Sequence, residues 1–135
     1  MFAVIDSNVL IASILWRGNC YKIMLKALKK EFSICLSDEI LTEVEEKLRK
    51  KFKFPEDMIA IHMNMLRNFF IIVAPKQKLS VVKNDPKDDK FVEAAVEGKC
   101  DYIVSGDKKH LLKLKEYEGI KIISPKNFLD ILNEK

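Results

Sequence analysis

The chain has 135 residues, which is enough for one compact domain with a real core and too few for two domains of typical size. Hydrophobic residues make up 48% of it and charged residues 33%, a balance that excludes intrinsic disorder as the default state. The net charge of +4 is too small to identify a dedicated nucleic-acid binder, so charge alone does not reveal the class of partner.

The cysteines and histidines argue against a disulfide framework and against a zinc site. The three cysteines are odd in number and far apart, as is typical of a protein in a reducing cytosol. His62 and His110 are too scattered to give metal-ligand spacing. Asp6 and Asn8 interrupt the apolar N-terminal stretch, and no apolar run reaches the roughly 20 residues that span a bilayer. We therefore expect a soluble, cytoplasmic protein.

Short apolar runs alternate along the chain with stretches of helical periodicity. In chain order the runs are FAVI (2–5), FSICL (32–36), FFIIVA (69–74), DYIVS (101–105) and IKII (120–123). Runs of this length, bounded by polar or turn residues, are typical of strands buried on both faces.

Helical patterns fill several of the segments between these runs. The predicted helices cover 19–30, 38–51, a segment that opens at Pro55, and a segment that opens at Asp88 or Asp89 and ends at Gly98. Ser37 stands where the N-cap of the second helix belongs. The stretch 75–87 is the one candidate for a long irregular connection.

This alternation predicts an α/β fold. The crossovers between runs are too long for hairpins, so the sheet should be mostly parallel with helices on both faces. We expect a single domain over residues 1–135, with three α/β/α layers around a sheet of four or five strands. Glycine and proline number only four each, and no linker divides the chain.

Several carboxylates lie just beyond the carboxyl ends of the predicted strands, where sheets of this kind usually have their active sites. Asp6 follows the first predicted strand, and Asp107 follows the fourth within the phrase IVSGD. Glu43 and either Asp88 or Asp89 lie near helix starts. Clustered carboxylates repel one another unless a hard divalent cation such as Mg²⁺ or Mn²⁺ compensates their charge. Such a site suits metal-assisted hydrolysis of phosphodiester bonds.

Four phrases in this order resemble the PIN-domain family of nucleases, and especially its toxins from toxin–antitoxin pairs. They are VIDSNVLI, LSDEILTEV, DPKDDKFVEAA and DYIVSGDKKHLL, and the resemblance extends to the closing SPKNFLDIL. It implies that Asp6 is the first metal-binding aspartate, followed by Asn8, and that Glu43 is the helix glutamate. It also implies that Asp107 is the last acid, with the hydroxyl of Ser105 orienting it.

The remaining acid of the resemblance is either Asp88 or Asp89. The family spacing to the last acid favours Asp89, whereas Asp88 lies on the apolar stripe of the predicted helix. We expect Asp89 to be the ligand and Asp88 to cap the helix or share the metal.

The resemblance implies a Mg²⁺- or Mn²⁺-dependent ribonuclease that cleaves single-stranded RNA. Its partners would be RNA, a cognate antitoxin and a second copy of the chain in a homodimer. Arg17, Lys108 and Lys109 are candidates for contacts with substrate phosphates.

Other interpretations remain open for the acids. Taken singly, Asp6 and Asp107 would cap helices, and Glu43 would be a solvated helix residue. A PIN-like fold that keeps its acids could also be a non-catalytic RNA-binding or assembly module. A phosphatase or receiver domain is disfavoured, because Asn8 stands where a dehalogenase-type phosphatase needs an acid and FFIIVAPK offers no phospho-accepting aspartate.

Overall fold

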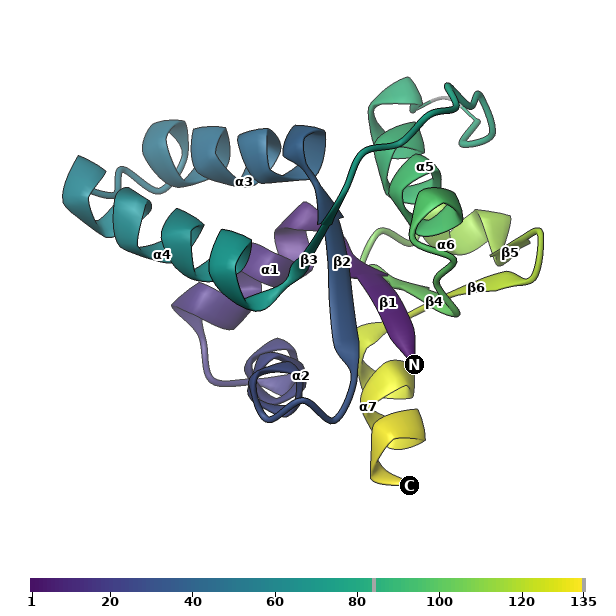
Figure 1. Cartoon of the computed structure of the whole chain (residues 1–135), viewed down its shortest axis with the longest axis horizontal. Helices are drawn as coiled ribbons and strands as arrows, with labels where there is room; N and C mark the ends of the chain where they lie inside the picture. The colour runs from purple at the N-terminus through teal and green to yellow at the C-terminus, as the bar shows by residue number, and fades with distance from the viewer. Residues whose placement is uncertain (84, 135) are drawn as a thin grey trace.

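The structure is a computed structural model that describes residues 1–83 and 85–134. Within these ranges, six strands form one sheet in the order β3-β2-β1-β4-β6-β5 (Figure 1). The strands are β1 (Phe2–Ile5), β2 (Ser33–Ser37), β3 (Ile71–Val73), β4 (Tyr102–Val104), β5 (Glu116–Tyr117) and β6 (Ile120–Ile123). All neighbouring pairs are parallel except β5 and β6. The predicted α/β fold with a mostly parallel sheet is confirmed.

The helices are α1 (Ser7–Leu15), α2 (Asn19–Leu28), α3 (Asp38–Lys50), α4 (Glu56–Phe69), α5 (Asp89–Glu97), α6 (Leu111–Leu114) and α7 (Pro125–Asn133). A short 3-10 turn, η1 (Pro86–Asp88), leads into α5. All four predicted helices are present, and Ser37 caps α3 by accepting a hydrogen bond from the Ile40 amide at 3.3 Å. In the described part of the chain, no helix is both long and apolar enough to cross a membrane.

Two features of the sheet differ from the sequence prediction. The strand beyond the expected four or five is β5, whose two residues are too short to show a periodicity. The run that forms β3 is not buried on both faces, since Ile71 and Ile72 are 42% and 36% exposed. The reason is position, because β3 lies at the edge of the sheet.

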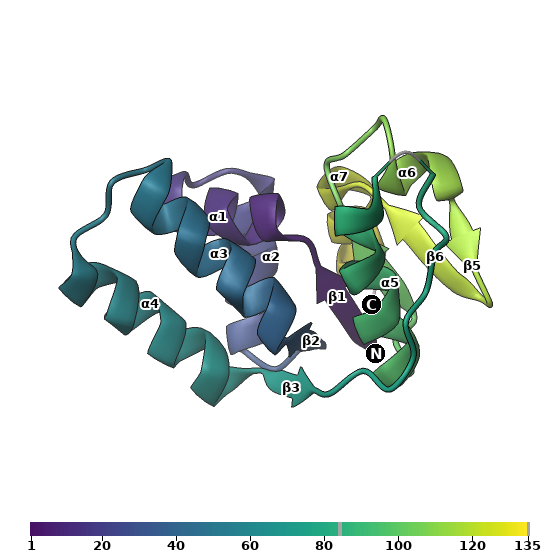
Figure 2. The ribbon, with the colours of Figure 1, turned by 90° about the horizontal axis from the view of Figure 1, so that it is seen from above.

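The order of the strands brings the predicted acids together. β1 lies between β2 and β4, and Ala3 and Val4 of β1 are fully buried. Helix α5 contacts β1, β2 and β4, whereas α3 contacts β2. Figure 2 shows α1 to α4 on the left of the molecule and α5 with α6 on the right. Residues that follow β1 and β4 therefore meet residues from α3 and α5 at the carboxyl ends of the central strands.

The predicted irregular connection, 75–87, is held against α5 by three acids one helical turn apart, Asp89, Glu93 and Glu97. Their carboxylates accept hydrogen bonds from backbone amides of the loop. The donors are Val81 and Val82 to Asp89, Leu79 to Glu93 and Lys76 to Glu97, at 2.8–3.1 Å. Asn84, within the same predicted loop, lies outside the described residues. The anchored loop delivers η1 to the site.

Candidate metal centre

A cleft of about 900 Å³ opens where the carboxyl ends of the central strands meet α3, η1 and the start of α5. Its acidic lining residues are Asp6, Glu39, Glu43, Glu46, Asp85, Asp88 and Asp107. Its basic lining residues are Lys47, Lys50, Lys51, Lys87, Lys90 and His110. The cleft thus combines a cluster of carboxylates with walls that carry positive charge.

Asp6 is a buried acid with two roles. Its Oδ1 accepts a hydrogen bond from the Val9 amide at 2.8 Å, so the side chain is the N-cap of α1. It also lines the cleft, where the Ser105 hydroxyl and the Gly106 amide lie close enough to lower its pKa. Burial raises the pKa of Asp6, and these contacts offset part of that rise. Capping and a position in the cleft are therefore compatible.

Ser105 lies close to both Asp6 and Asp107. It is fully buried, and its Oγ accepts a hydrogen bond from the Asp107 amide at 3.0 Å. The Asp107 carboxylate accepts hydrogen bonds from the amides of Lys109 and His110 at 3.1 and 3.3 Å. These contacts hold Asp107 at the end of β4. The orienting role expected for the Ser105 hydroxyl stays a prediction.

Asp85, Asp88, Asp107 and His110 form the tightest group in the cleft. Each offers one ligand atom, and these atoms all lie within 4.8 Å of one another. His110 Nδ1 lies 3.3 Å from Asp107 Oδ2 and 3.4 Å from Asp85 Oδ2. The sequence did not mark Asp85 and His110 as candidate ligands, because the two residues are 25 positions apart and only the fold brings them together. The only local signal is the spacing of three residues from Asp85 to Asp88 and from Asp107 to His110.

This group holds three carboxyl groups and one imidazole, so its acidic groups outnumber its basic one. Burial raises the pKa of Asp88 to about 8, with further increases from its hydrogen bond to Asp107 and from the nearby Asp85. Burial also acts to raise the pKa of Asp107, but hydrogen bonds from Asp88 and from backbone amides outweigh it and hold that pKa below its usual value. Near neutral pH, Asp88 thus keeps a proton that a divalent cation would displace.

The structure brings Asp88, and not Asp89, into this cluster. Asp88 occupies the N-cap position of α5, but its side chain makes no capping hydrogen bond and lines the cleft. Asp89 is only 6% exposed, and its Oδ1 already accepts the amides of Val81 and Val82. Asp88 and Asp89 point in different directions because Asp88 ends η1 as the N-cap of α5 and Asp89 is the first residue of that helix, a difference that spacing along the sequence does not reveal.

Glu43 lies on the α3 wall between two lysines. Its Oε2 is 2.6 Å from Lys90 Nζ, and its Oε1 is 3.5 Å from Lys47 Nζ. Burial acts to raise the pKa of Glu43, but the pairing with Lys90 and Lys47 outweighs it and lowers that pKa below its usual value. Lys47 also donates a hydrogen bond to Asn8 Oδ1 at 3.0 Å, which places Asn8 at the same wall.

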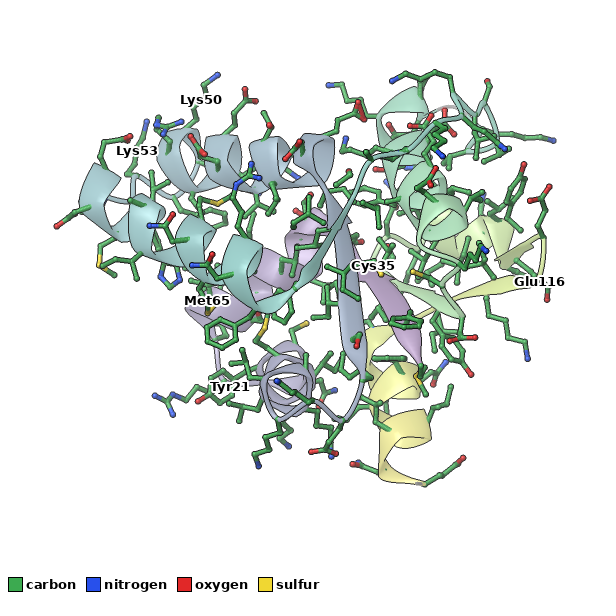
Figure 3. The ribbon with its side chains drawn as sticks, in the orientation of Figure 1. Tyr21, Cys35, Lys50, Lys53, Met65 and Glu116 are labelled. Atoms are coloured by element: carbon green, nitrogen blue, oxygen red, sulfur yellow. The ribbon has the colours of Figure 1, made fainter. Side chains whose placement is uncertain are left out.

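The basic residues proposed for substrate contact do not line the cleft. Arg17 lies over the ring of Tyr21, 5.1 Å from its centroid, and Lys108 is exposed next to Asp107 but is not among the lining residues. Lys109 lines a separate hollow. The cleft is bordered instead by lysines of α3, η1 and α5, and Figure 3 shows Lys50 extending outward from α3. Sequence could not distinguish these lysines from the other exposed ones.

The donor set fits a hard divalent ion. Asp6, Asp88 and Asp107 offer carboxylate oxygens, which Mg²⁺ and Mn²⁺ prefer. The imidazole of His110 within the tightest group favours Mn²⁺ over Mg²⁺, because nitrogen ligands suit transition metals better.

Comparisons with known proteins identify relatives of this fold and the family of the chain. The chain is similar in fold to a chain in the crystal structure of VapBC2 from Rickettsia felis bound to a DNA fragment from their promoter, with 13% identity and a TM-score of 0.63 over 92% of this chain and 98% of that one. It is also similar to PAE2754 from Pyrobaculum aerophilum, with 14% identity and a TM-score of 0.66 over 100% of this chain and 91% of that one. No curated protein sequence matches it. The family model of the PIN domain matches residues 3–109, and the chain therefore belongs to the PIN-domain family.

Proposed function

We propose that the chain is a metal-dependent endoribonuclease that hydrolyses phosphodiester bonds of single-stranded RNA, and that it is the toxin of a toxin–antitoxin pair. The observation that supports this most directly is the convergence of acids from four separate segments in one cleft bordered by lysines. PIN-domain membership and the fold similarity to VapBC2 support the same proposal.

The metal ligands we propose are Asp6, Glu43 and Asp107, as the sequence predicted, with Asp88 in place of Asp89. Mg²⁺ or Mn²⁺ bound there would make a water molecule more acidic and stabilise negative charge on the scissile phosphate. Asp88 would release its proton when the ion binds, since the ligand form is the carboxylate.

The protein's other groups would position substrate. Ser105, which accepts a hydrogen bond from the Asp107 amide and lies close to Asp6, would preorganise these two acids. The cleft lysines would contact phosphates on either side of the scissile bond, which sets the path of the strand without reading its sequence. An open cleft with this charge pattern suits a flexible single strand.

A long RNA of mixed sequence tests the activity. Purified protein is incubated with it in Mn²⁺, in Mg²⁺ and in chelator, beside Asp6→Asn. Asp130→Asn, which makes the same change on α7 outside the cleft, is the matched control. We expect cuts that need the metal, vanish in Asp6→Asn and persist in Asp130→Asn. No cutting, with RNA binding unaffected by chelator, would instead indicate a non-catalytic binding module.

Partners and location follow from the same proposal. The fold similarity to VapBC2 supports a cognate antitoxin that binds this chain in the cytoplasm. We also propose a homodimer, which sedimentation equilibrium of the purified chain tests. A monomer at all concentrations up to that used for the cleavage assay would exclude the homodimer and leave the nuclease proposal intact.

A further inference from the structure

Lys90 is a buried lysine inside an acidic cleft, and lysines are seldom buried without a partner. Its side chain is 8% exposed, and its Nζ lies 2.6 Å from Glu43 Oε2. It also donates a hydrogen bond to the backbone carbonyl of Lys87 and lies 5.3 Å from the centroid of the Phe91 ring. The ammonium therefore has an anionic partner, a carbonyl partner and an aromatic face around it.

These contacts fix the ammonium between the two walls of the cleft. Lys90 belongs to α5, Glu43 belongs to α3, and the Lys87 carbonyl belongs to η1 next to Asp88. Moving the ammonium into solvent would leave the half-buried Glu43 carboxylate without its closest cation and the Lys87 carbonyl without this donor. Because separating a buried ion pair is costly, Lys90 should remain in place when the cleft is loaded.

Positive charge is distributed unevenly over the acids. Glu43 has two lysines, since Lys47 Nζ lies 3.5 Å from its Oε1. In residues 1–83 and 85–134, no lysine or arginine nitrogen lies within 4 Å of a carboxylate oxygen of Asp88 or Asp107. The Glu43 side of the cleft is thus compensated by two lysines. On the other side, the nitrogen beside Asp107 belongs to the imidazole of His110, 3.3 Å from Asp107 Oδ2.

We infer that Lys90 occupies the position that a second metal ion would take, so that the cleft binds a single divalent ion on the side of Asp88 and Asp107. This inference rests on the proposed metal-dependent function and narrows its ligand set. Glu43 then acts as a positioning residue, which holds the Lys90 ammonium and, through the Lys87 carbonyl, the turn that carries Asp88.

Mn²⁺ binding to the full chain tests the inference without reference to activity. Isothermal titration calorimetry and electron paramagnetic resonance of free Mn²⁺ count the ions bound per chain. We expect one ion on the unaltered protein. Glu43→Gln should keep that ion and weaken it by no more than about tenfold, the lower end of outer-shell effects, whereas Asp107→Asn should weaken it by more than about 100-fold.

Two changes at Lys90 complete the test. Lys90→Met removes the charge at similar length and should admit a second Mn²⁺, whereas Lys90→Arg keeps the charge and should remain at one. Two ions on the unaltered chain, one ion on a folded Lys90→Met, or equal losses from Glu43→Gln and Asp107→Asn would each overturn the inference. Because Glu43→Gln keeps a hydrogen-bond acceptor for Lys90, it gives a result even if Lys90→Met does not fold. One bound ion without RNA cleavage would overturn the proposed function and leave this inference standing.

Discussion

Carboxyl oxygens of Asp88 and Asp107 lie within 4.8 Å of each other, although Asp88 ends the 3-10 turn before α5 and Asp107 follows β4. The pair holds a proton at neutral pH, because burial and the neighbouring acids raise the pKa of Asp88 to about 8. Without a cation, this proton is what relieves the repulsion in the cleft. Stability and metal binding should therefore both depend on pH in this range.

Metal-free protein should lose stability as pH rises from about 4 to about 8. The carboxyl of Asp88 has an ordinary pKa of 3.8 and a folded pKa of about 8, so the folded state binds more protons between these values. The pKa of Asp6 is also raised by burial, so Asp6 adds to the decline. Glu43 and Asp107 have lowered pKa values and act with the opposite sign, but only at more acidic pH. Thermal unfolding in chelator between pH 5 and pH 9 measures the slope.

The matched variants for this measurement are Asp88→Asn and Asp130→Asn. Asp88→Asn cannot take up the proton and should flatten the decline in Tm toward pH 8. Asp130→Asn removes a carboxylate outside the cleft and should keep the decline. An equal slope in all three proteins would show that the proton does not reside on Asp88.

Mn²⁺ should bind more tightly as pH rises through about 8, since the ion must displace the proton of Asp88. Calorimetry in buffers with different heats of ionisation, at the same pH, counts the protons released. We expect release approaching one proton per ion at pH 7 and little above pH 9. Mg²⁺ should bind more weakly than Mn²⁺, because His110 offers a nitrogen ligand. Release that does not change with pH would contradict this account.

Asp88 and Asp89 should separate function from stability. Asp89→Ala removes a buried charged acceptor of two loop amides, which should cost about 3 kcal/mol of unfolding free energy and lower the Tm by about 10 °C. Asp88→Asn should abolish RNA cleavage and leave the metal-free Tm at pH 7 unchanged or higher. Circular dichroism melts and the RNA assay compare the two. Retained cleavage in Asp88→Asn beside its loss in a folded Asp89→Asn would reverse the assignment.

Asp88 and Asp89 illustrate what the sequence alone could and could not predict. Apolar runs located the strands well, with 2–5 and 120–123 matching β1 and β6, because a continuous hydrophobic run leaves little choice for a buried strand. The order of the motifs singled out Asp6, Glu43 and Asp107, and all three line the cleft. Spacing could not choose between adjacent helix residues, because that choice depends on where loop 75–87 passes over α5.

Contacts between distant segments account for most of the rest. His110 and Asp85 meet because α5, which follows Asp85 and η1, packs against β4, which precedes His110, and no local pattern marks the two residues as partners. Lys90 looks like a solvated lysine in the phrase DDKF, yet the fold buries it against Glu43. The lysines that border the cleft are likewise set by the positions of α3 and η1, which the sequence does not specify one residue at a time.

Ser105→Ala should weaken the metal site without unfolding the protein. The change removes a hydroxyl that accepts a hydrogen bond from the Asp107 amide and lies close to the Asp6 carboxylate, so both acids should be held less firmly. Loss of such an outer contact costs about 10- to 100-fold in metal affinity or activity. Mn²⁺ titration and RNA cleavage measure it. Ser124→Ala, which removes the N-cap of α7, changes stability but should leave Mn²⁺ affinity unchanged.

Lysines on the two walls of the cleft should strengthen the binding of RNA. Lys50 lies on α3 and Lys87 on η1, and both line the cleft, so together they could contact phosphates on opposite sides of the acids. Each lost contact with a single strand should reduce the slope of log affinity against log salt by about 0.7. The double change Lys50→Gln with Lys87→Gln should therefore lower that slope by about 1.4 and weaken RNA binding most at low salt.

A control of equal charge change distinguishes these contacts from a general effect of net charge. Lys22→Gln with Lys29→Gln alters two exposed lysines, one in α2 and one at its C-cap, that do not line the cleft, and Arg17→Gln tests a residue that the sequence had suggested. RNA binding by chelator-treated protein is measured by fluorescence anisotropy across a series of salt concentrations, so that cleavage does not interfere. A slope lowered equally by the α2 pair would mean that RNA follows the overall charge of the chain. A slope lowered only by the cleft pair would place the strand across the acids, where hydrolysis requires it.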